Sequence, residues 1–357
     1  MKTYIIAEAG VNHNGDPGRA LGLVDVAADA GADCVKFQTF RPEETISAGA
    51  PKATYQMRHT GADESQLEMA RGLTLDDAVF FRLAERCETR GIAFLSTPFD
   101  LFSIDFLARE MGLPTLKLPS GEITNGPHLL AAARTERDII LSTGMSTLED
   151  VETALAVLAF GFVRPRARPS TAAIFEAYRS DEGRAALQGK VSVLHCTTEY
   201  PAPFADVNLR AMDSLRDAFG LPVGLSDHTP GIAVPIAAAA RGAVIIEKHV
   251  TLDRSLPGPD HKASLEPGEL TAMVDGIRSV ETAMGDGEKR PMPSELKNMP
   301  VARRSLVARV PIRAGETFTE ENLCAKRPGN GISPMGYWDW LGRTADRDYA
   351  ADEPVDG

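Results

Sequence analysis

Cysteine is scarce in this sequence, and its four cysteines lack the Cys-x-x-Cys spacing of a metal cluster. Neither a disulfide framework nor a zinc cluster is therefore predicted. No apolar run approaches the roughly 20 residues that a membrane helix needs. No signal peptide is visible, because a polar, strand-like motif begins a few residues after Met1. We expect a reducing, cytoplasmic setting and no membrane contact.

Positive charge is also in short supply. The 357 residues include 38 Lys and Arg against 50 Asp and Glu, which gives a formal net charge of −12. A nucleic-acid backbone demands a basic protein surface, so no nucleic-acid partner is expected. The shortage of basic residues does not exclude a small anionic substrate, because a few lysines can make one site positive on a protein whose net charge is negative.

Short β-rich runs recur along the chain, with amphipathic or Ala-rich segments between them. Strands are expected over residues 4–9, 33–39, 92–98, 115–120, 138–143, 191–197, 222–227 and 244–250. Eight strands alternating with helices favour an α/β fold of the (β/α)8 TIM-barrel type. The alternative is an open doubly wound sheet, which the strand count and the missing GxGxxG fingerprint both disfavour.

The amino-acid composition of the sequence changes after about residue 285. We predict a catalytic barrel over residues 1–285, a Pro- and Gly-containing linker over 286–300 and a small domain over 301–357. So small a domain is near the lower limit for a core of its own, so we expect it to dock on the barrel or on a partner subunit. Residues 163–190, a polar insertion rich in Arg, are interpreted as a surface excursion with a helix of its own.

Polar groups end two of the predicted strands. In VIIEKHV, residues 244–250, Glu247 and His249 share one face while Lys248 points to the other. In GLSDH, residues 224–228, Ser226 and His228 share a face. Barrel enzymes place their chemistry at the carboxyl ends of the strands. These polar endings are therefore predicted to form one site.

Counting by twos extends this pattern to other strands, with the apolar member first and the polar member last. It pairs Ile6 with Glu8, Lys36 with Gln38, Ile140 with Ser142, and Val193 with His195 and Thr197. His228 and His249 end adjacent strands, and two imidazoles with open positions suit a divalent metal. His195 is a candidate third ligand, but a hydrogen-bonded structural role fits it equally well.

Two lysines, Lys36 and Lys117, also end strands. Together with nearby hydroxyl groups they predict a cradle for phosphate or carboxylate. The hydroxyl groups belong to Thr97, Ser120 and Ser142. In the alternative interpretation the lysines pair with Glu8, Glu122 or Glu247, and both arrangements can hold at once. The residues alone thus predict a metal-assisted reaction on a small phosphorylated or carboxylated substrate.

The motifs resemble the sialic acid (nonulosonate) synthase family along nearly the whole chain. The matching stretches are IIAEAGVNHNG (5–15), VKFQTF (35–40), FLSTPFD (94–100), LKLPSGE (116–122), IILSTGM (139–145), LHCTTEYP (194–201), GLSDHT (224–229), EKHVT (247–251) and PGPDH (257–261). The tail, with ARRS (302–305) and KRPGNGISP (326–334), resembles the family's antifreeze-like domain, also called the SAF domain.

The resemblance implies an enzyme that condenses phosphoenolpyruvate with N-acetylmannosamine or a related 2-acetamido-mannose aldehyde, with C–O cleavage and phosphate release. It implies Mn²⁺ or Mg²⁺ held by His228 and His249. It also implies a homodimer with exchanged C-terminal domains, in which Arg327 reaches the active site of the other subunit. As catalytic residues it implies Glu122, Glu247, Lys36 and Lys117. As substrate contacts it implies Glu8, Gln38, Thr97, Ser120, Ser142, Thr198, Tyr200, Ser226, Asp260 and Arg327.

The form VKFQTF, with APKATYQ (50–56) and DESQLEM (63–69) after it, resembles the legionaminate-type and spore-coat-type branch of the family. The alternative aldehyde is therefore 2,4-diacetamido-2,4,6-trideoxymannose. A synthase of shorter sugar acids, such as an octulosonate or heptulosonate, is a second alternative. A non-catalytic carbohydrate- or ice-binding protein is a third, which the polar strand ends oppose.

Overall fold

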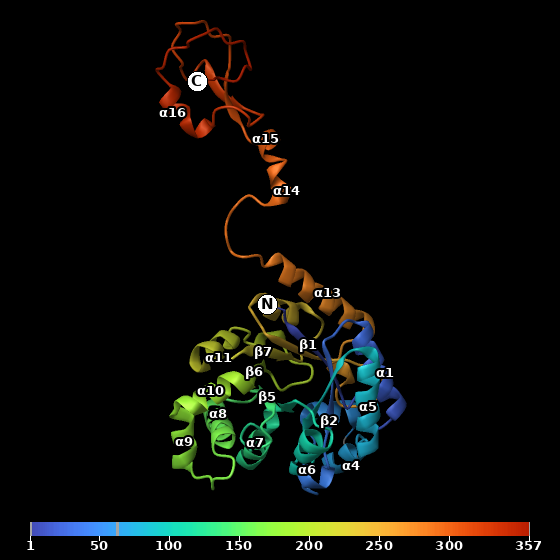
Figure 1. The fold of residues 1–357 in the computed structure, drawn as a ribbon. Helices are drawn as coiled ribbons and strands as arrows, with labels where there is room; N and C mark the ends of the chain where they lie inside the picture. The colour runs from blue at the N-terminus through green and yellow to red at the C-terminus, as the bar shows by residue number, and fades with distance from the viewer. Residues whose placement is uncertain (1, 62–63, 357) are drawn as a thin grey trace. The chain divides into compact units, whose positions relative to one another are not determined.

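The computed structural model describes residues 2–61 and 64–356. The chain divides into two compact units, Met1–Gly285 and Asp286–Gly357. The first unit is a barrel of parallel strands surrounded by helices, as Figure 1 shows. Its strands are β1 (Tyr4–Gly10), β2 (Cys34–Thr39), β3 (Ala93–Pro98), β4 (Thr115–Leu118), β5 (Asp138–Ser142), β6 (Val191–Cys196), β7 (Val223–Asp227) and β8 (Ile245–His249).

The strands are hydrogen bonded in the order β3-β2-β1-β8-β7-β6-β5-β4, and β3 and β4 pack side by side at the remaining seam. The predicted (β/α)8 barrel is thereby confirmed, and each strand lies within about two residues of its predicted ends. The open doubly wound alternative is excluded, because the two outermost strands of an open sheet would not meet.

Helices of very different length connect the strands. They are α1 (Pro17–Asp29), α2 (Pro42–Thr45), α3 (Thr54–Thr60), α4 (Gln66–Arg71), α5 (Asp77–Arg90), α6 (Leu101–Asp105), α7 (Gly126–Ala133), α8 (Leu148–Val163), α9 (Thr171–Arg179), α10 (Asp181–Lys190), α11 (Ala211–Phe219), α12 (Ala233–Ala240) and α13 (Pro267–Ala283). The single-turn elements are η1 (Phe106–Glu110), η2 (Ser120–Glu122), η3 (Phe204–Asp206) and η4 (His261–Ala263). The insertion at 163–190 carries two helices, α9 and α10, where one was expected. Among the described residues, no helix has the length and apolar character needed to cross a bilayer.

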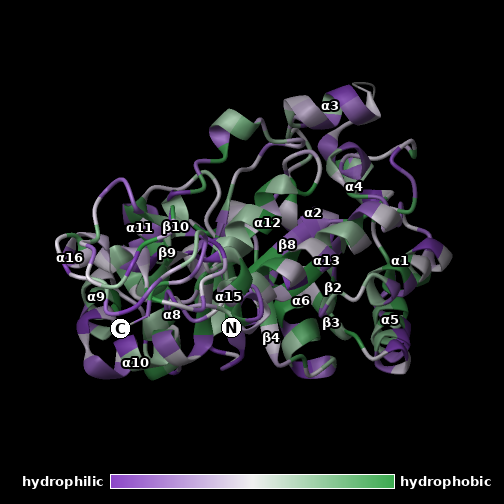
Figure 2. Ribbon diagram, turned by 90° about the horizontal axis from the view of Figure 1, so that it is seen from above, coloured by the Kyte–Doolittle hydropathy of each residue, from purple (hydrophilic) through white to green (hydrophobic). Residues whose placement is uncertain are grey.

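Two apolar layers hold the barrel together. The larger layer lies between the strands and the helices and includes Leu23, Phe80 and Leu158. Figure 2 shows the resulting division, with hydrophobic residues along the strands and both classes of residue on covering helices such as α5. The smaller layer fills the barrel interior and consists of Ile6, Cys34, Leu95, Ile140, Leu194 and Ile245. This inner layer closes the barrel below the ends of the strands.

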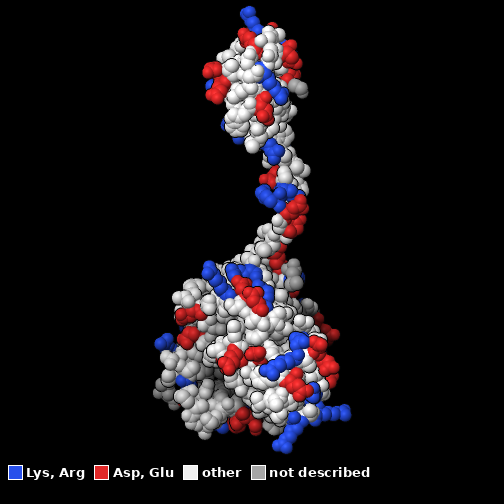
Figure 3. All heavy atoms as spheres, turned by 90° about the vertical axis from the view of Figure 1, so that its left-hand side faces the viewer, with Lys and Arg blue, Asp and Glu red and all other residues white. Residues whose placement is uncertain are grey.

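The second unit is small and largely irregular. It contains α14 (Pro293–Leu296), α15 (Met299–Ala302), β9 (Ser305–Ala308), β10 (Leu323–Lys326), η5 (Pro334–Gly336) and α16 (Tyr337–Trp340). β9 and β10 pair antiparallel, and Leu306, Phe318, Leu323 and Tyr349 are among the residues of its core. On the face of the molecule in Figure 3, lysines and arginines are interspersed with acidic residues over the first unit.

Candidate active site

A cavity of about 350 Å³ opens at the carboxyl ends of the barrel strands. The residues two positions beyond the inner apolar layer line it, because side chains along a strand alternate between the two faces. These residues are Glu8, Lys36, Thr97, Ser142, Cys196 and Glu247. The apolar layer is thus the floor of the cavity, and charged and hydroxyl groups lie directly above the floor.

Two lysines and two glutamates form a buried ionic network at the base of the cavity. The Nζ atom of Lys36 lies 2.6 Å from Oε2 of Glu8 and 3.6 Å from Oε2 of Glu247. The Nζ atom of Lys117 lies 3.3 Å from Oε1 of Glu247. All four side chains are at most 5% exposed. The sequence left open whether the lysines pair with glutamates, and here three of the four possible Lys–Glu pairs are formed.

The network controls the ionisation of its members. Burial raises the pKa of Glu247, but the charges of Lys117 and Lys36 outweigh burial and lower this pKa to about 2. Burial lowers the pKa of Lys36, but Glu247 and Glu8 outweigh burial and raise it. Burial also lowers the pKa of Lys117, and there it prevails over the attraction of Glu247. Glu247 and Lys36 are therefore charged around neutral pH, beside a lysine that is more easily deprotonated.

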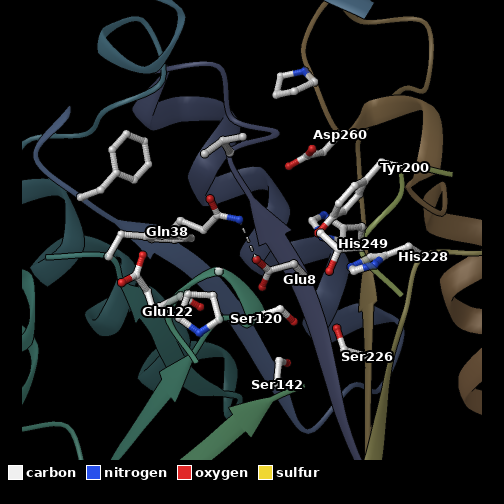
Figure 4. Close-up of a pocket in the computed structure, with 18 of the residues that line it drawn as sticks. Glu8, Gln38, Ser120, Glu122, Ser142, Tyr200, Ser226, His228, His249 and Asp260 are labelled. Atoms are coloured by element: carbon white, nitrogen blue, oxygen red, sulfur yellow. Dashed lines mark hydrogen bonds between the residues drawn. The ribbon is translucent and has the colours of Figure 1, made fainter. Parts of the chain in front are cut away.

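Two imidazoles meet at one side of the cavity, as predicted. The ring centroids of His228 and His249 lie 5.4 Å apart, and Figure 4 shows both rings on the same side of the pocket. The Nδ1 atom of His228 lies 2.7 Å from the carbonyl oxygen of Thr197, so this nitrogen carries the proton and donates it. In the neutral form of the ring, the Nε2 atom of His228 keeps a lone pair.

His249 is also suited to bind a metal ion. Burial and the charge of His228 lower its pKa well below the usual value, so its ring is neutral. Its Nδ1 atom is buried without a hydrogen-bond partner. Among the described residues, no group of three or more His, Cys, Asp or Glu gathers to hold a metal ion. A divalent cation bound between the two imidazoles would thus keep positions open for water and substrate, and the donor set fits such an ion.

Three of the predicted substrate contacts, Gln38, Tyr200 and Asp260, lie around the mouth of the cavity. Tyr200 stacks on His228 with ring centroids 4.1 Å apart, and Asp260 lies close by at the same side in Figure 4. Burial raises the pKa of Asp260 to about 6. Gln38 lies across the pocket and donates from Nε2 to Oε1 of Glu8 at 3.3 Å. The lining thus includes Glu8, Gln38, Tyr200 and Asp260, which offer both donors and acceptors to a polyhydroxylated ligand.

The predicted hydroxyl groups line the cavity as well. Lys36 donates to Oγ1 of Thr97 at 2.9 Å, and Ser226 donates to Oε1 of Glu247 at 2.8 Å. The hydroxyl oxygens of Ser142 and Thr198 are buried without a partner. Ser120 accepts the backbone N–H of Gly144 at 2.9 Å. The two unpartnered oxygens are groups that a bound ligand would satisfy.

Two predicted residues lie apart from the ionic network. Glu122 is half-buried at the rim, where its Oε2 accepts a hydrogen bond from Asn125 at 2.6 Å. It lines the cavity on the side opposite the imidazoles (Figure 4). Arg327 belongs to the second unit, where it is exposed and donates from Nε to the carbonyl oxygen of Ala302 at 2.9 Å. Its predicted role in another subunit stays a prediction.

His195 is not a metal ligand. Its Nε2 atom lies 2.6 Å from the carbonyl oxygen of Val207, and the residue does not line the cavity. The predicted face of this strand was wrong: β6 turns Leu194 and Cys196 inward, because Leu194 pairs with Ser142 of β5 and Cys196 pairs with Ser226 of β7. Register partners on parallel strands point to the same side of the sheet. The structural alternative for His195 is the one observed.

An apolar part of the lining was not predicted from the sequence. Phe40, Ile46, Met69, Ala70, Leu73 and Phe99 line the cavity from the segments that follow β2 and β3. Phe40 ends the motif VKFQTF and Phe99 is the second-to-last residue of FLSTPFD, so their position just after a strand was a usable signal. The cavity also includes Cys196, whose Sγ atom lies 3.9 Å from Nδ1 of His228. All four cysteines of the chain are free.

The sequence matches two known family models. The NeuB family model matches residues 23–289, and the SAF domain model matches residues 303–357. The N,N'-diacetyllegionaminic acid synthase of Campylobacter jejuni is 51% identical over 354 residues, which cover 99% of this chain and 99% of that protein. The N,N'-diacetyllegionaminic acid synthase of Legionella pneumophila is 44% identical over 334 residues, which cover 94% of this chain and 88% of that protein.

A solved structure shares the same architecture. The crystal structure of N-acetylneuraminic acid (sialic acid) synthetase from Leptospira borgpetersenii in complex with citrate superposes with a TM-score of 0.67. Its sequence is 33% identical, and the match covers 84% of this chain and 90% of that chain.

Proposed function

This chain belongs to the NeuB family, and on that premise we propose that it is a legionaminate-type nonulosonate synthase, which condenses phosphoenolpyruvate with 2,4-diacetamido-2,4,6-trideoxymannose. The main support for this proposal is the cavity, which is lined by two buried lysines, two neighbouring imidazoles and unpartnered hydroxyl groups. The family's synthases are phosphoenolpyruvate-dependent transferases, so the expectation of an enzyme over a binding protein is confirmed.

The choice of sugar rests on the relatives. The two legionaminic acid synthases are 51% and 44% identical to this chain, whereas the sialic acid synthetase of known structure is 33% identical. The diacetamido sugar is therefore preferred to N-acetylmannosamine, the aldehyde that the sequence analysis put first. The motif forms that resemble the legionaminate-type branch support the same choice.

The base of the cavity suits phosphoenolpyruvate. The phosphate and carboxylate groups of phosphoenolpyruvate are anions, and the cavity lining contains two buried cations, Lys36 and Lys117. The free hydroxyls of Ser142 and Thr198 can donate to the same oxygens. Binding both reactants in one small cavity holds the carbon atoms that form the new bond in contact, which removes much of the entropic barrier.

The reaction forms one carbon–carbon bond and one carbon–oxygen bond from water to C2, and it breaks the carbon–oxygen bond from C2 to the phosphate. C3 of phosphoenolpyruvate attacks the open-chain aldehyde, and water then adds to C2, where positive charge develops. The resulting tetrahedral intermediate expels inorganic phosphate. We assign the proton transfers to Glu247 and Glu122, because both carboxylates line the cavity.

His228 and His249 are assigned to a divalent cation, Mn²⁺ or Mg²⁺. When bound, such an ion polarises the aldehyde carbonyl as a Lewis acid. The imidazoles are held ready for it, His228 by its hydrogen bond to the backbone of β6–α11 and His249 by its burial. Tyr200, stacked on His228, restricts the ring further.

The subunit arrangement is a further part of this proposal. We assign the SAF unit of one chain to the active site of a second chain in a homodimer, with Arg327 as the group that reaches the substrate. The residue is exposed and engages a single backbone carbonyl, so it is free to contact a ligand of another chain. A linker over 286–300 would give the unit this reach.

Phosphate release tests the proposed function. Purified enzyme with Mn²⁺ and phosphoenolpyruvate is expected to release phosphate with 2,4-diacetamido-2,4,6-trideoxymannose and more slowly with N-acetylmannosamine. The mass of the product distinguishes a nine-carbon acid from the shorter acids of octulosonate or heptulosonate synthases. If no sugar of the panel releases phosphate, the proposed function is wrong.

A further inference from the structure

We propose that an uncharged wall across the cavity from the two imidazoles binds the methyl-bearing end of the sugar and selects a 6-deoxy sugar over its 6-hydroxy counterpart. The inference rests on the proposed function and names the residues that set its specificity. The wall consists of Phe40, Ile46, Met69, Ala70, Leu73 and Phe99.

The wall differs from the rest of the lining in charge. Among the described residues that line the cavity, those from chain segments 40–73 and 99 are all uncharged. Their polar members, such as Thr45 and Gln66, offer hydroxyl, phenol and amide groups only. The acidic, basic and imidazole groups come from the strands themselves and from the loops after β4, β7 and β8. One side of the mouth is therefore suited to apolar and acetamido groups.

The barrel topology places this wall opposite the imidazoles. In the ring order of the strands, β3 is separated from β7 by three strands, and β2 is separated from β7 by two, β1 and β8. Phe40 follows β2 and Phe99 follows β3, whereas His228 follows β7. A sugar whose aldehyde lies at the imidazoles and whose chain crosses the mouth therefore brings its far end to the wall.

Contacts within the wall hold it in place. The rings of Phe40 and Phe99 meet edge to face with centroids 6.1 Å apart. The backbone N–H of Arg41 donates to Oδ2 of Asp100 at 2.8 Å, which ties the segments after β2 and β3 together. Arg71 of α4 pairs with Glu43 of α2 at 2.8 Å. These contacts join the segments after β2 and β3 that carry the wall.

The chemistry of the sugar decides what this surface selects. A 6-deoxy sugar ends in a methyl group, which gains by leaving water for an apolar surface. A hydroxyl at the same carbon would lose its water hydrogen bonds there, because Leu73 offers no partner and the thioether sulfur of Met69 is only a weak acceptor. Hydrophobic pockets reject such an added hydroxyl by roughly 100-fold at most. We expect the intact enzyme to prefer the 6-deoxy sugar by about 10- to 100-fold in kcat/KM.

The test compares 2,4-diacetamido-2,4,6-trideoxymannose with its 6-hydroxy counterpart, using phosphate release by the full-length enzyme with Mn²⁺. Met69→Gln and Leu73→Asn keep the side-chain size but make the wall polar. Each is expected to lower kcat/KM for the 6-deoxy sugar by about tenfold and to bring the ratio between the two sugars toward one. Met57→Gln is the matched control, because Met57 lies on α3, is 41% exposed and does not line the cavity.

Each outcome decides one question. Equal kcat/KM for the two sugars in the unmodified enzyme would overturn the role of the wall and leave the proposed function standing. Loss of phosphate release with every sugar would instead count against the proposed function. An equal fall for both sugars in Met69→Gln and Leu73→Asn, with thermal unfolding unchanged, would show that the wall shapes the cavity without selecting the sugar.

Discussion

The Nζ atom of Lys248 lies 2.6 Å from Oδ2 of Asp227, and both side chains are at most 2% exposed. The two residues are register partners on β8 and β7 and point away from the cavity. Their neighbours along the chain point into it: Ser226 and His228 flank the aspartate, and Glu247 and His249 flank the lysine. The ion pair on the outer face thus fixes the register of the two strands that carry the imidazoles.

Removing one partner of this pair is expected to destabilise the barrel strongly. Lys248→Met leaves Asp227 as an uncompensated buried charge, which costs about 3 to 5 kcal/mol. Thr229 also donates to Asp227, at 3.0 Å from Oγ1, but a hydroxyl does not neutralise the charge. Urea unfolding measures the loss. The double variant Asp227→Asn with Lys248→Met should recover most of it, and a double variant as unstable as the single one would contradict the account.

Lys117 is expected to hold the anionic substrate. Lys117→Met removes a buried cation that would contact the phosphate or carboxylate of phosphoenolpyruvate, and truncating such a charge costs about 2 to 5 kcal/mol. We predict that kcat/KM for phosphoenolpyruvate falls by about 30-fold or more. Lys190→Met is the control, because the Nζ atom of Lys190 donates to the carbonyl oxygen of Glu136 and the residue does not line the cavity. A Lys117 variant with normal kinetics would refute the cradle.

Metal binding is expected to depend on the two facing imidazoles. His228→Ala and His249→Ala should each weaken Mn²⁺ binding by about 100-fold or more, since the loss of even an outer-shell contact costs 10- to 100-fold. Electron paramagnetic resonance of free Mn²⁺ measures binding without turnover. His195→Gln is the matched control, because that residue bonds Val207 outside the cavity. Unchanged affinity in the two alanine variants would show that the ligands are elsewhere.

The stability of the barrel is expected to fall in mild acid because of His13. Burial lowers the pKa of this residue to about 4, although Asp16 opposes the shift. The unfolded chain binds the proton with a pKa near 6.5, so it holds more protons than the folded chain between about pH 6.5 and 4. Stability is therefore complete above that range and is lost as the pH falls through it.

The size of this effect follows from the linkage relation. Between about pH 7 and pH 5, His13 should account for a loss of about 2 kcal/mol in the free energy of unfolding. His13→Gln should lose less over the same interval, as measured by urea unfolding at both pH values. His261, whose pKa burial also lowers to about 4, stays in both proteins and cancels in the comparison. The same pH dependence in the variant and the parent would exclude His13 as the cause.

The sequence predicted most of the site because strand periodicity carries the relevant information. Glu8, Lys36, Ser142 and Glu247 each stand two residues beyond an apolar residue of the inner layer, and this spacing is visible without a structure. The same rule failed at β6, where Val193 and His195 copy the apolar-then-polar pattern on the outer face. Only the register with β5 and β7 decides which face of that strand turns inward.

The uncharged wall was not predictable in the same way. Met69 belongs to α4, a helix of six residues inside the long connection between β2 and β3, and Leu73 follows this helix. No strand period reaches across such a connection, so the position of these residues relative to the cavity depends on tertiary packing. Strand periodicity therefore predicts the lining side chains that lie on strands, but it does not predict those that lie on the connection between β2 and β3.

The exchanged homodimer is open to a test by complementation. An Arg327→Ala chain and a Lys117→Met chain are each expected to be nearly inactive alone. If Arg327 serves the active site of the partner subunit, a mixed dimer contains one site with both residues intact. Random mixing should then restore about one quarter of the normal activity, because half of the dimers are mixed and each has one working site.

If Arg327 serves its own chain instead, no site in the mixture holds both residues, and activity stays at the level of the single variants. Mass photometry confirms that dimers form and exchange in the mixture. Arg313→Ala with the Lys117→Met chain is the control: Arg313 is an exposed arginine of the same unit, so its loss leaves each Lys117-containing barrel active before mixing. Recovery confined to the Arg327 mixture would place this guanidinium at the substrate of the partner subunit.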